Sequence, residues 1–110
     1  MKILLDEGVP DIIQKRLSRF SIFSVKEMSW RGVKNGVLLD SMADDFQIII
    51  TTDKNLPLQQ NLKNRQISAI ILPTNEIPAV IDLLPQIEQA IAKLPPGEFK
   101  QLEMPGRISP

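Results

Sequence analysis

The strongest constraint on the fold of this chain is its alternation of short apolar runs with helical patterns. Apolar runs typical of buried strands occupy residues 2–5, 20–25, 46–50 and 67–72. Helical patterns follow them at residues 11–19, 36–45, 58–63 and 76–94. Strands that alternate with helices join by right-handed crossovers into a parallel sheet. The sequence therefore predicts an α/β domain with a mainly parallel sheet of four or five strands.

Local signals refine this outline. Asn35 is a favourable N-cap for the second helix, and Pro85 predicts a kink or break in the long helix over 76–94. From Pro95 onward the chain is rich in proline, glycine and polar residues. We therefore predict a domain over residues 1–95 and an extended tail over 96–110. At most one short strand, near residues 99–102, is expected in that tail.

Composition excludes several classes of site. The 110 residues suit one domain, and 13 basic residues balance 13 acidic ones, so any contact with nucleic acid needs a local patch. The chain has no cysteine and no histidine, which excludes disulfides, thiolate metal sites, a histidine general base and histidine-bound zinc. Any bound metal is expected to be a hard ion held by oxygen, such as Mg²⁺ or Mn²⁺.

The same sequence points to a cytoplasmic protein. Charged Asp6 and Glu7 follow only three apolar residues, which is too short a run for a secretory signal. No apolar run approaches the roughly 20 residues that span a bilayer. The absence of cysteine also fits a reducing compartment. We expect a soluble protein without membrane contact.

Acidic residues close two of the predicted strands. Asp6 and Glu7 follow the first, and Thr51, Thr52 and Asp53 follow the third. Open parallel sheets bind ligands at the carboxyl ends of their strands, so these acids would converge if the two strands are neighbours. Two carboxylates ~4 Å apart repel by about 4 kcal/mol at an effective dielectric of ~20. A proton or a divalent ion between Asp6, Glu7 and Asp53 is therefore expected, and such an ion would activate water and bind a phosphoryl oxygen.

Each position also has a purely structural interpretation. Asp6 can cap the following helix, Glu7 can face solvent, and Asp53 with Asn55 can form an Asx-turn. The joint placement of the acids after two apolar strands favours a site. Five basic residues would form a phosphate-binding surface if they gather around the acids, and the alternative is that they are scattered surface charges. They are Arg31, Lys34, Lys54, Lys63 and Arg65. Asp40 and Asp44, which share a helix face, are interpreted as solvated charges.

Several segments together resemble the small PIN-like proteins of the DUF5615 type. They are Ile3–Pro10, Trp30–Leu39, Ile49–Leu56, Gln59–Leu62 and Ile70–Pro73, and the resemblance covers residues 1–95. It implies a three-layer α/β/α PIN-like domain and a metal-dependent ribonuclease ancestry. It also implies a role as the toxin component of a bacterial toxin–antitoxin pair.

The resemblance assigns roles to individual residues. Asp6 and Glu7 match the family's acidic pair, and Asp53 matches the acid after the threonine-rich strand. Asn35 and Asn55 stand where the family commonly has further acids, so metal affinity and the field at a bound water should be weaker. Asn35 and Asn55 would then be auxiliary ligands or would orient water, supported by Thr51 or Thr52.

Three functions follow as hypotheses. The leading one is a Mg²⁺- or Mn²⁺-dependent endoribonuclease that acts on RNA, with an antitoxin-like partner and a homodimeric state as further expectations. The alternative is a degenerate, non-catalytic PIN-like module that binds a protein or RNA. The most remote is a receiver-like phosphoacceptor domain, which also pairs acids after the first strand with an aspartate after the third. That interpretation requires a lysine after a fifth strand, and Lys93 or Lys100 would have to serve.

Overall fold

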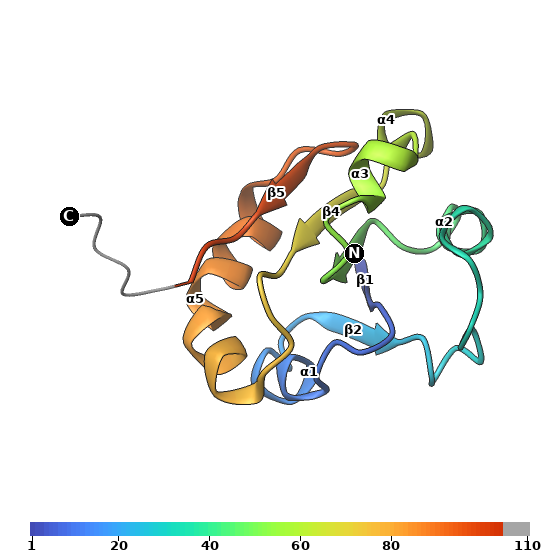
Figure 1. Ribbon diagram of the computed structural model, residues 1–110. Coiled ribbons are helices and arrows are strands. Elements are labelled where there is room, and N and C mark those ends of the chain that lie inside the picture. Colours follow the sequence, from blue (N-terminus) through green and yellow to red (C-terminus); the bar gives the residue numbers. More distant parts are fainter. Residues whose placement is uncertain (105–110) are drawn as a thin grey trace.

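The computed structural model describes residues 1–104, which form alternating strands and helices (Figure 1). No helix in this range is long and apolar enough to cross a membrane. The elements in chain order are β1 (Lys2–Leu5), α1 (Ile12–Arg16), β2 (Ser21–Ser24), α2 (Asn35–Met42), β3 (Ile48–Thr51), α3 (Leu56–Gln59), α4 (Leu62–Arg65), β4 (Ser68–Ile71), α5 (Ile77–Lys93) and β5 (Phe99–Gln101).

The five strands form one parallel sheet in the order β2-β1-β3-β4-β5. The predicted parallel α/β fold is therefore confirmed, with five strands. β1 and β3 are direct neighbours, and Leu5 of β1 is in register with Ile50 of β3. In this doubly wound order the connections change direction between β1 and β3, and ligands bind at such a switch point.

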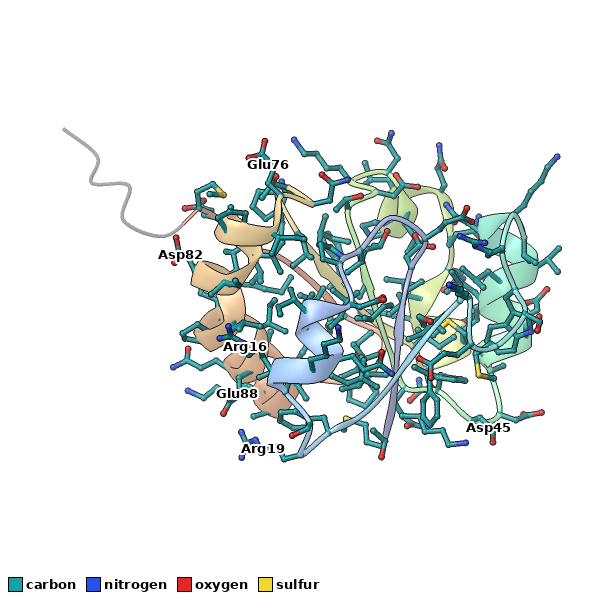
Figure 2. The ribbon with its side chains drawn as sticks, turned by 90° about the horizontal axis from the view of Figure 1, so that it is seen from below. Arg16, Arg19, Asp45, Glu76, Asp82 and Glu88 are labelled. Atoms are coloured by element: carbon teal, nitrogen blue, oxygen red, sulfur yellow. The ribbon has the colours of Figure 1, made fainter. Side chains whose placement is uncertain are left out.

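Helices cover both faces of the sheet, so the domain has the predicted three layers. On one face, α1 and α5 pack on the sheet through buried residues such as Ile13 and Ile87. Arg19, just beyond α1, forms an ion pair with Glu88 of α5 on the outer surface (Figure 2). On the other face, Leu39 of α2 and Leu56 of α3 belong to a second core cluster. The strands are thus buried on both sides, which explains their nearly continuous apolar sequences.

Three local predictions differ from the structure. Asn35 is the first residue of α2 rather than its N-cap, which is Lys34, because its side chain binds Asp53 instead. The predicted helix over 58–63 is two short helices, because Gln60 is extended and Asn61 caps α4 by accepting from the backbone N–H of Asn64. The break considered at Pro85 is absent, since α5 continues through that exposed residue and its buried stripe extends on both sides.

The segment predicted as a tail from residue 96 contains the fifth strand. β5 pairs with β4, and its extension places Leu102 in the core, 3% exposed. Ser68 Oγ of β4 donates to the carbonyl of Pro95 at 2.8 Å, which secures the start of this segment. The sheet therefore includes residues beyond 95, while residues 105–110 of the predicted tail lie outside the described residues.

Candidate functional site at the ends of β1 and β3

Asp6 and Thr51 meet where β1 and β3 end. The backbone N–H of Asp6 donates to the carbonyl of Ile50 at 2.9 Å, which continues the strand ladder by one residue. Thr51, the last residue of β3, is 1% exposed, and its hydroxyl donates to Asp6 Oδ2 at 2.7 Å. The first predicted acid is therefore held against the neighbouring strand by a buried hydroxyl.

Asp53 is tied to the same hydroxyl and to two asparagines. Its backbone N–H donates to Thr51 Oγ1 at 3.1 Å. Its Oδ1 accepts from the backbone N–H of Asn55 at 2.9 Å, which is the Asx-turn considered for this pair. Its Oδ2 accepts from the Nδ2 of Asn35, also at 2.9 Å. Asn35 thus acts through its side chain, whereas Asn55 contacts Asp53 through its backbone.

The Thr51 hydroxyl links the two acids in a defined direction. A hydroxyl has a single hydrogen. The Thr51 hydroxyl donates it to the Asp6 carboxylate, and its oxygen accepts from the backbone N–H of Asp53. Because the group is buried, removing it would leave both partners without their hydrogen bond. Thr51 is therefore the residue that fixes the relative positions of Asp6 and Asp53.

Replacing Thr51 with valine is expected to lower the free energy of unfolding by about 1–3 kcal/mol, because the half-buried Asp6 carboxylate and the backbone N–H of Asp53 lose their partner. Thr51→Ser keeps the hydroxyl and loses one methyl group, at a cost of about 1 kcal/mol. Urea denaturation of both variants measures the difference. Equal destabilisation by valine and serine would show that the hydroxyl bridge contributes nothing.

Glu7 is directed toward a different partner. Its backbone N–H donates to Asp6 Oδ1 at 2.8 Å, and its Oε1 accepts from the backbone N–H of Gly32 at 2.9 Å. Gly32 has φ +74°, a left-handed conformation that glycine adopts without a Cβ penalty. Glu7 therefore anchors the loop over residues 25–34. This contact was not predicted, and Gly32 itself was its only sequence signal.

The loop that Glu7 holds is itself well ordered by hydrogen bonds. Ser24 and Glu27 exchange two of them, since the backbone N–H of Ser24 donates to Glu27 Oε1 and the Ser24 hydroxyl accepts from the Glu27 N–H. The Ser24 backbone bond, followed by the side-chain bond from Gln14, lowers the pKa of Glu27. Val25, the first residue of this loop, continues the ladder between β1 and β2, since its N–H donates to the carbonyl of Leu5. The position of Gly32 beside Glu7 follows from this framework.

The predicted cations fall into two groups, those beside the network and those paired with an acid. Lys63 belongs to the second group, because its Nζ lies 4.0 Å from Glu98 Oε1. Arg31, Lys34 and Lys54 are exposed, and each is the sequence neighbour of a residue in the network: Gly32, Asn35 and Asp53. Arg65 instead donates through Nε and Nη2 to Asp40 Oδ1, at 3.2 and 2.8 Å. Asp40 is therefore paired rather than merely solvated, and Arg65 is engaged away from the acids.

Two other polar residues near the site, Thr52 and Gln60, form no hydrogen bond to the acids within residues 1–104. Thr52 is half-buried, and its side chain forms no hydrogen bond within residues 1–104. Gln60 lies against Gly36, where a Cβ would be 3.5 Å from Gln60 Oε1. The neighbouring Asn61 is explained by capping α4. Gln60 therefore approaches Gly36, the residue next to Asn35.

The donor chemistry of the site suits a hard divalent ion of limited affinity. Within the described part of the chain, no group of three or more acidic side chains is arranged to hold a metal. A complete cage made by Asp6, Glu7 and Asp53 is therefore not preformed. Mg²⁺ commonly binds through only one or two carboxylates and takes its other ligands from water and substrate phosphates. Asp6 and Asp53 match that smaller requirement.

The sheet order alone does not select an activity, because receiver domains and flavodoxins share it. The lysine that a receiver-like site requires is not at this edge. Lys100 is the middle residue of β5. The residue after it, Gln101, is in register with Ile71 of β4, which is in register with Thr51 of β3, so Lys100 lies one residue before the level of Thr51. Lys93 ends α5. No family model, curated protein or solved structure matches this chain.

Proposed function

We propose that this protein is a Mg²⁺- or Mn²⁺-dependent endoribonuclease whose acidic centre is Asp6 and Asp53. The observation that supports it is the linkage of these two acids through Thr51 at the switch point between β1 and β3. This is where open α/β sheets bind ligands. An all-oxygen donor set beside exposed cations suits a phosphate-containing substrate.

Each residue has a specific task in this proposal. Asp6 and Asp53 would hold the ion, which when bound neutralises charge on a phosphate and activates water. Thr51 orients Asp6, and Asn35 orients Asp53. Because the amide nitrogen of Asn35 is used on Asp53, its carbonyl oxygen is the atom left to accept from water.

The surrounding residues would position the RNA. Glu7 binds Gly32 and would thereby hold the loop that carries Arg31 and Lys34 close to the acids. Together with Lys54 they supply positive charge for phosphates that flank the cleaved bond, a contribution that weakens with salt. Arg65 is not included, because Asp40 already binds it.

The resemblance to PIN-like proteins of the DUF5615 type supports the same assignment. It extends the proposal to a toxin that is controlled by an antitoxin-like protein. Asn35 and Asn55 stand where that family's pattern has acids. We therefore expect the ion to bind weakly.

Metal removal is the direct test. Purified protein is expected to cleave a single-stranded RNA with a fluorophore and a quencher at its ends when Mn²⁺ or Mg²⁺ is present. EDTA is expected to abolish cleavage, and excess Mn²⁺ to restore it. Cleavage that persists in EDTA would contradict a metal-dependent mechanism.

A non-catalytic module is the second candidate, and one observation favours it. All four carboxylate oxygens of Asp6 and Asp53 accept a hydrogen bond from the protein itself. Such a network is satisfied without an ion. Titration calorimetry with Mn²⁺ separates the candidates. Binding of Mn²⁺ at millimolar concentration or below is required by the nuclease, and the absence of such binding supports the non-catalytic module.

A further inference from the structure

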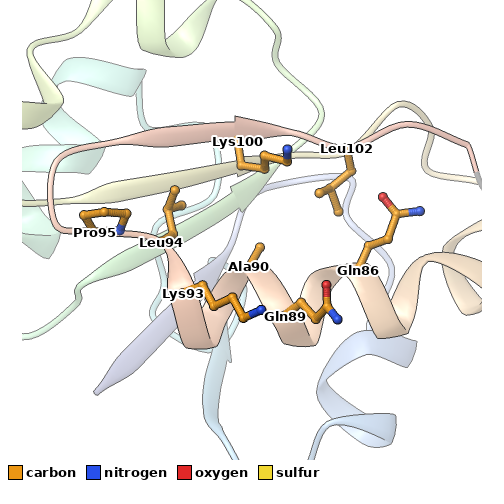
Figure 3. Close-up of a pocket in the computed structure, with 8 residues that line it drawn as sticks. All are labelled: Gln86, Gln89, Ala90, Lys93, Leu94, Pro95, Lys100 and Leu102. Carbon is orange, nitrogen blue, oxygen red and sulfur yellow. The ribbon is translucent and has the colours of Figure 1, made fainter.

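A groove separates α5 from β5, apart from the candidate nuclease site (Figure 3). Its volume is about 450 Å³. None of its lining residues belongs to the network around Asp6 and Asp53. The residues that line it are Gln86, Gln89, Ala90, Lys93, Leu94, Pro95, Lys100 and Leu102.

The groove combines an apolar base with a positively charged rim. Ala90 and Leu94, which are half-buried, supply aliphatic surface between the helix and the strand, and Lys93 and Lys100 stand on opposite sides (Figure 3). Within residues 1–104, neither lysine forms an ion pair and no acidic residue lines the groove. The groove therefore complements a ligand that carries both apolar and acidic side chains.

The groove also borders an open edge of the sheet. β5 is the last strand in the sheet order, so its outer side has no partner strand in the described part of the chain. Lys100 and Leu102 are two residues apart and face α5 together, as the alternation of a strand requires. A strand added beside β5 would thus place every second side chain over the groove.

We propose that the edge of β5 and this groove bind an extended peptide segment of a partner protein, in which an acidic and an apolar residue are two positions apart. The acid lies opposite Lys100, and the apolar residue lies level with Leu102 and packs near the half-buried Ala90. Backbone hydrogen bonds to β5 supply affinity, and the two side chains supply selectivity. This surface is independent of the proposed nuclease activity.

Two other occupants fit less well. A second copy that paired β5 with β5 around Lys100 would set two lysines opposite each other, which is destabilising, and edge lysines commonly prevent such pairing. RNA is usually held by aromatic side chains on which bases stack, and the groove lining contains none among the described residues.

The test uses the full chain labelled with ¹⁵N and a synthetic octapeptide with the sequence glutamate–threonine–valine–threonine repeated twice. Addition of the peptide is expected to shift the amide resonances of β5 and of the groove side of α5. The double variant Lys93→Glu/Lys100→Glu is expected to bind at least about tenfold more weakly and to prefer the same peptide with lysine in place of glutamate. The matched control, Lys26→Glu at an exposed position outside the groove, should leave the affinity unchanged.

A peptide N-methylated on alternate backbone amides should fail to bind, because it cannot pair with β5. The proposal is overturned if millimolar octapeptide shifts no groove resonance, or if the N-methylated peptide binds equally well. It is also overturned if decauridine shifts the same resonances at lower concentration, or if sedimentation shows a dimer that Lys100→Glu dissociates.

Discussion

Asp53→Asn is expected to reduce Mn²⁺-dependent RNA cleavage by at least about 100-fold, because it removes one of two charges that would hold the ion. The substitution has a second consequence. Asp53 accepts from both Asn35 and Asn55, whereas an asparagine side chain offers only one acceptor oxygen. The side-chain amide of Asn35 must then lose its hydrogen bond to residue 53 or flip by 180°. A fluorogenic RNA assay measures kcat and KM for each variant at fixed salt.

Asp44→Asn is the matched control. Asp44 is exposed just after α2 and lies outside the Asp6–Thr51–Asp53 network, so cleavage should remain within about twofold of the unaltered protein. Circular dichroism would verify that both variants are folded. Full activity of a folded Asp53→Asn variant would exclude Asp53 from the catalytic centre.

The meeting of Asp6 with the end of β3 could be predicted because it depends only on the order of apolar runs. Strands that alternate with helices become neighbours in a parallel sheet, and their carboxyl ends lie at one edge. The direction of Glu7 could not be predicted in this way. Its partner is the backbone N–H of Gly32, a group that every residue except proline carries and that no side-chain pattern reveals.

Asn35 shows how a distant partner overrides a local signal. An asparagine before a helical pattern is a favourable N-cap, and this preference is local. Asp53 is 18 positions away in sequence, and its Oδ2 accepts the Asn35 amide at 2.9 Å. A charge-assisted hydrogen bond of this kind is roughly twice as strong as a neutral one. Asn35 consequently begins the helix with its side chain bound to Asp53.

The short strand predicted near residues 99–102 is confirmed by β5, but its place in the sheet is difficult to predict because its own residues are exposed. Phe99, Lys100 and Gln101 have no buried member, so the sequence lacks the alternation that marks a half-buried strand. What holds the strand lies outside it: the ladder to β4 and the burial of Leu102. Such long-range contacts are invisible in a local pattern, and the composition after Pro95 pointed to a tail.

Gly97→Ala should reveal how firmly this segment belongs to the domain. Gly97 is buried at φ +81°, and a Cβ there would lie 2.9 Å from the Cα of Lys63 in α4. The added methyl group therefore meets both backbone strain and a steric clash. We expect the free energy of unfolding to fall by roughly 2–5 kcal/mol, measured by urea denaturation.

Gly8→Ala separates the two causes. Gly8 has φ +86°, but no atom from elsewhere in the fold lies within 4 Å of the position that a Cβ would take. This variant therefore carries the backbone strain alone and should cost roughly 1–2 kcal/mol. Because the nearest atom to Gly97 is a Cα, Lys63→Ala should not rescue Gly97→Ala. Equal losses at the two glycines would mean that the segment before β5 does not pack on α4. A larger loss at Gly97 would establish that contact as part of the cooperative fold, and with it the edge strand that borders the proposed peptide groove.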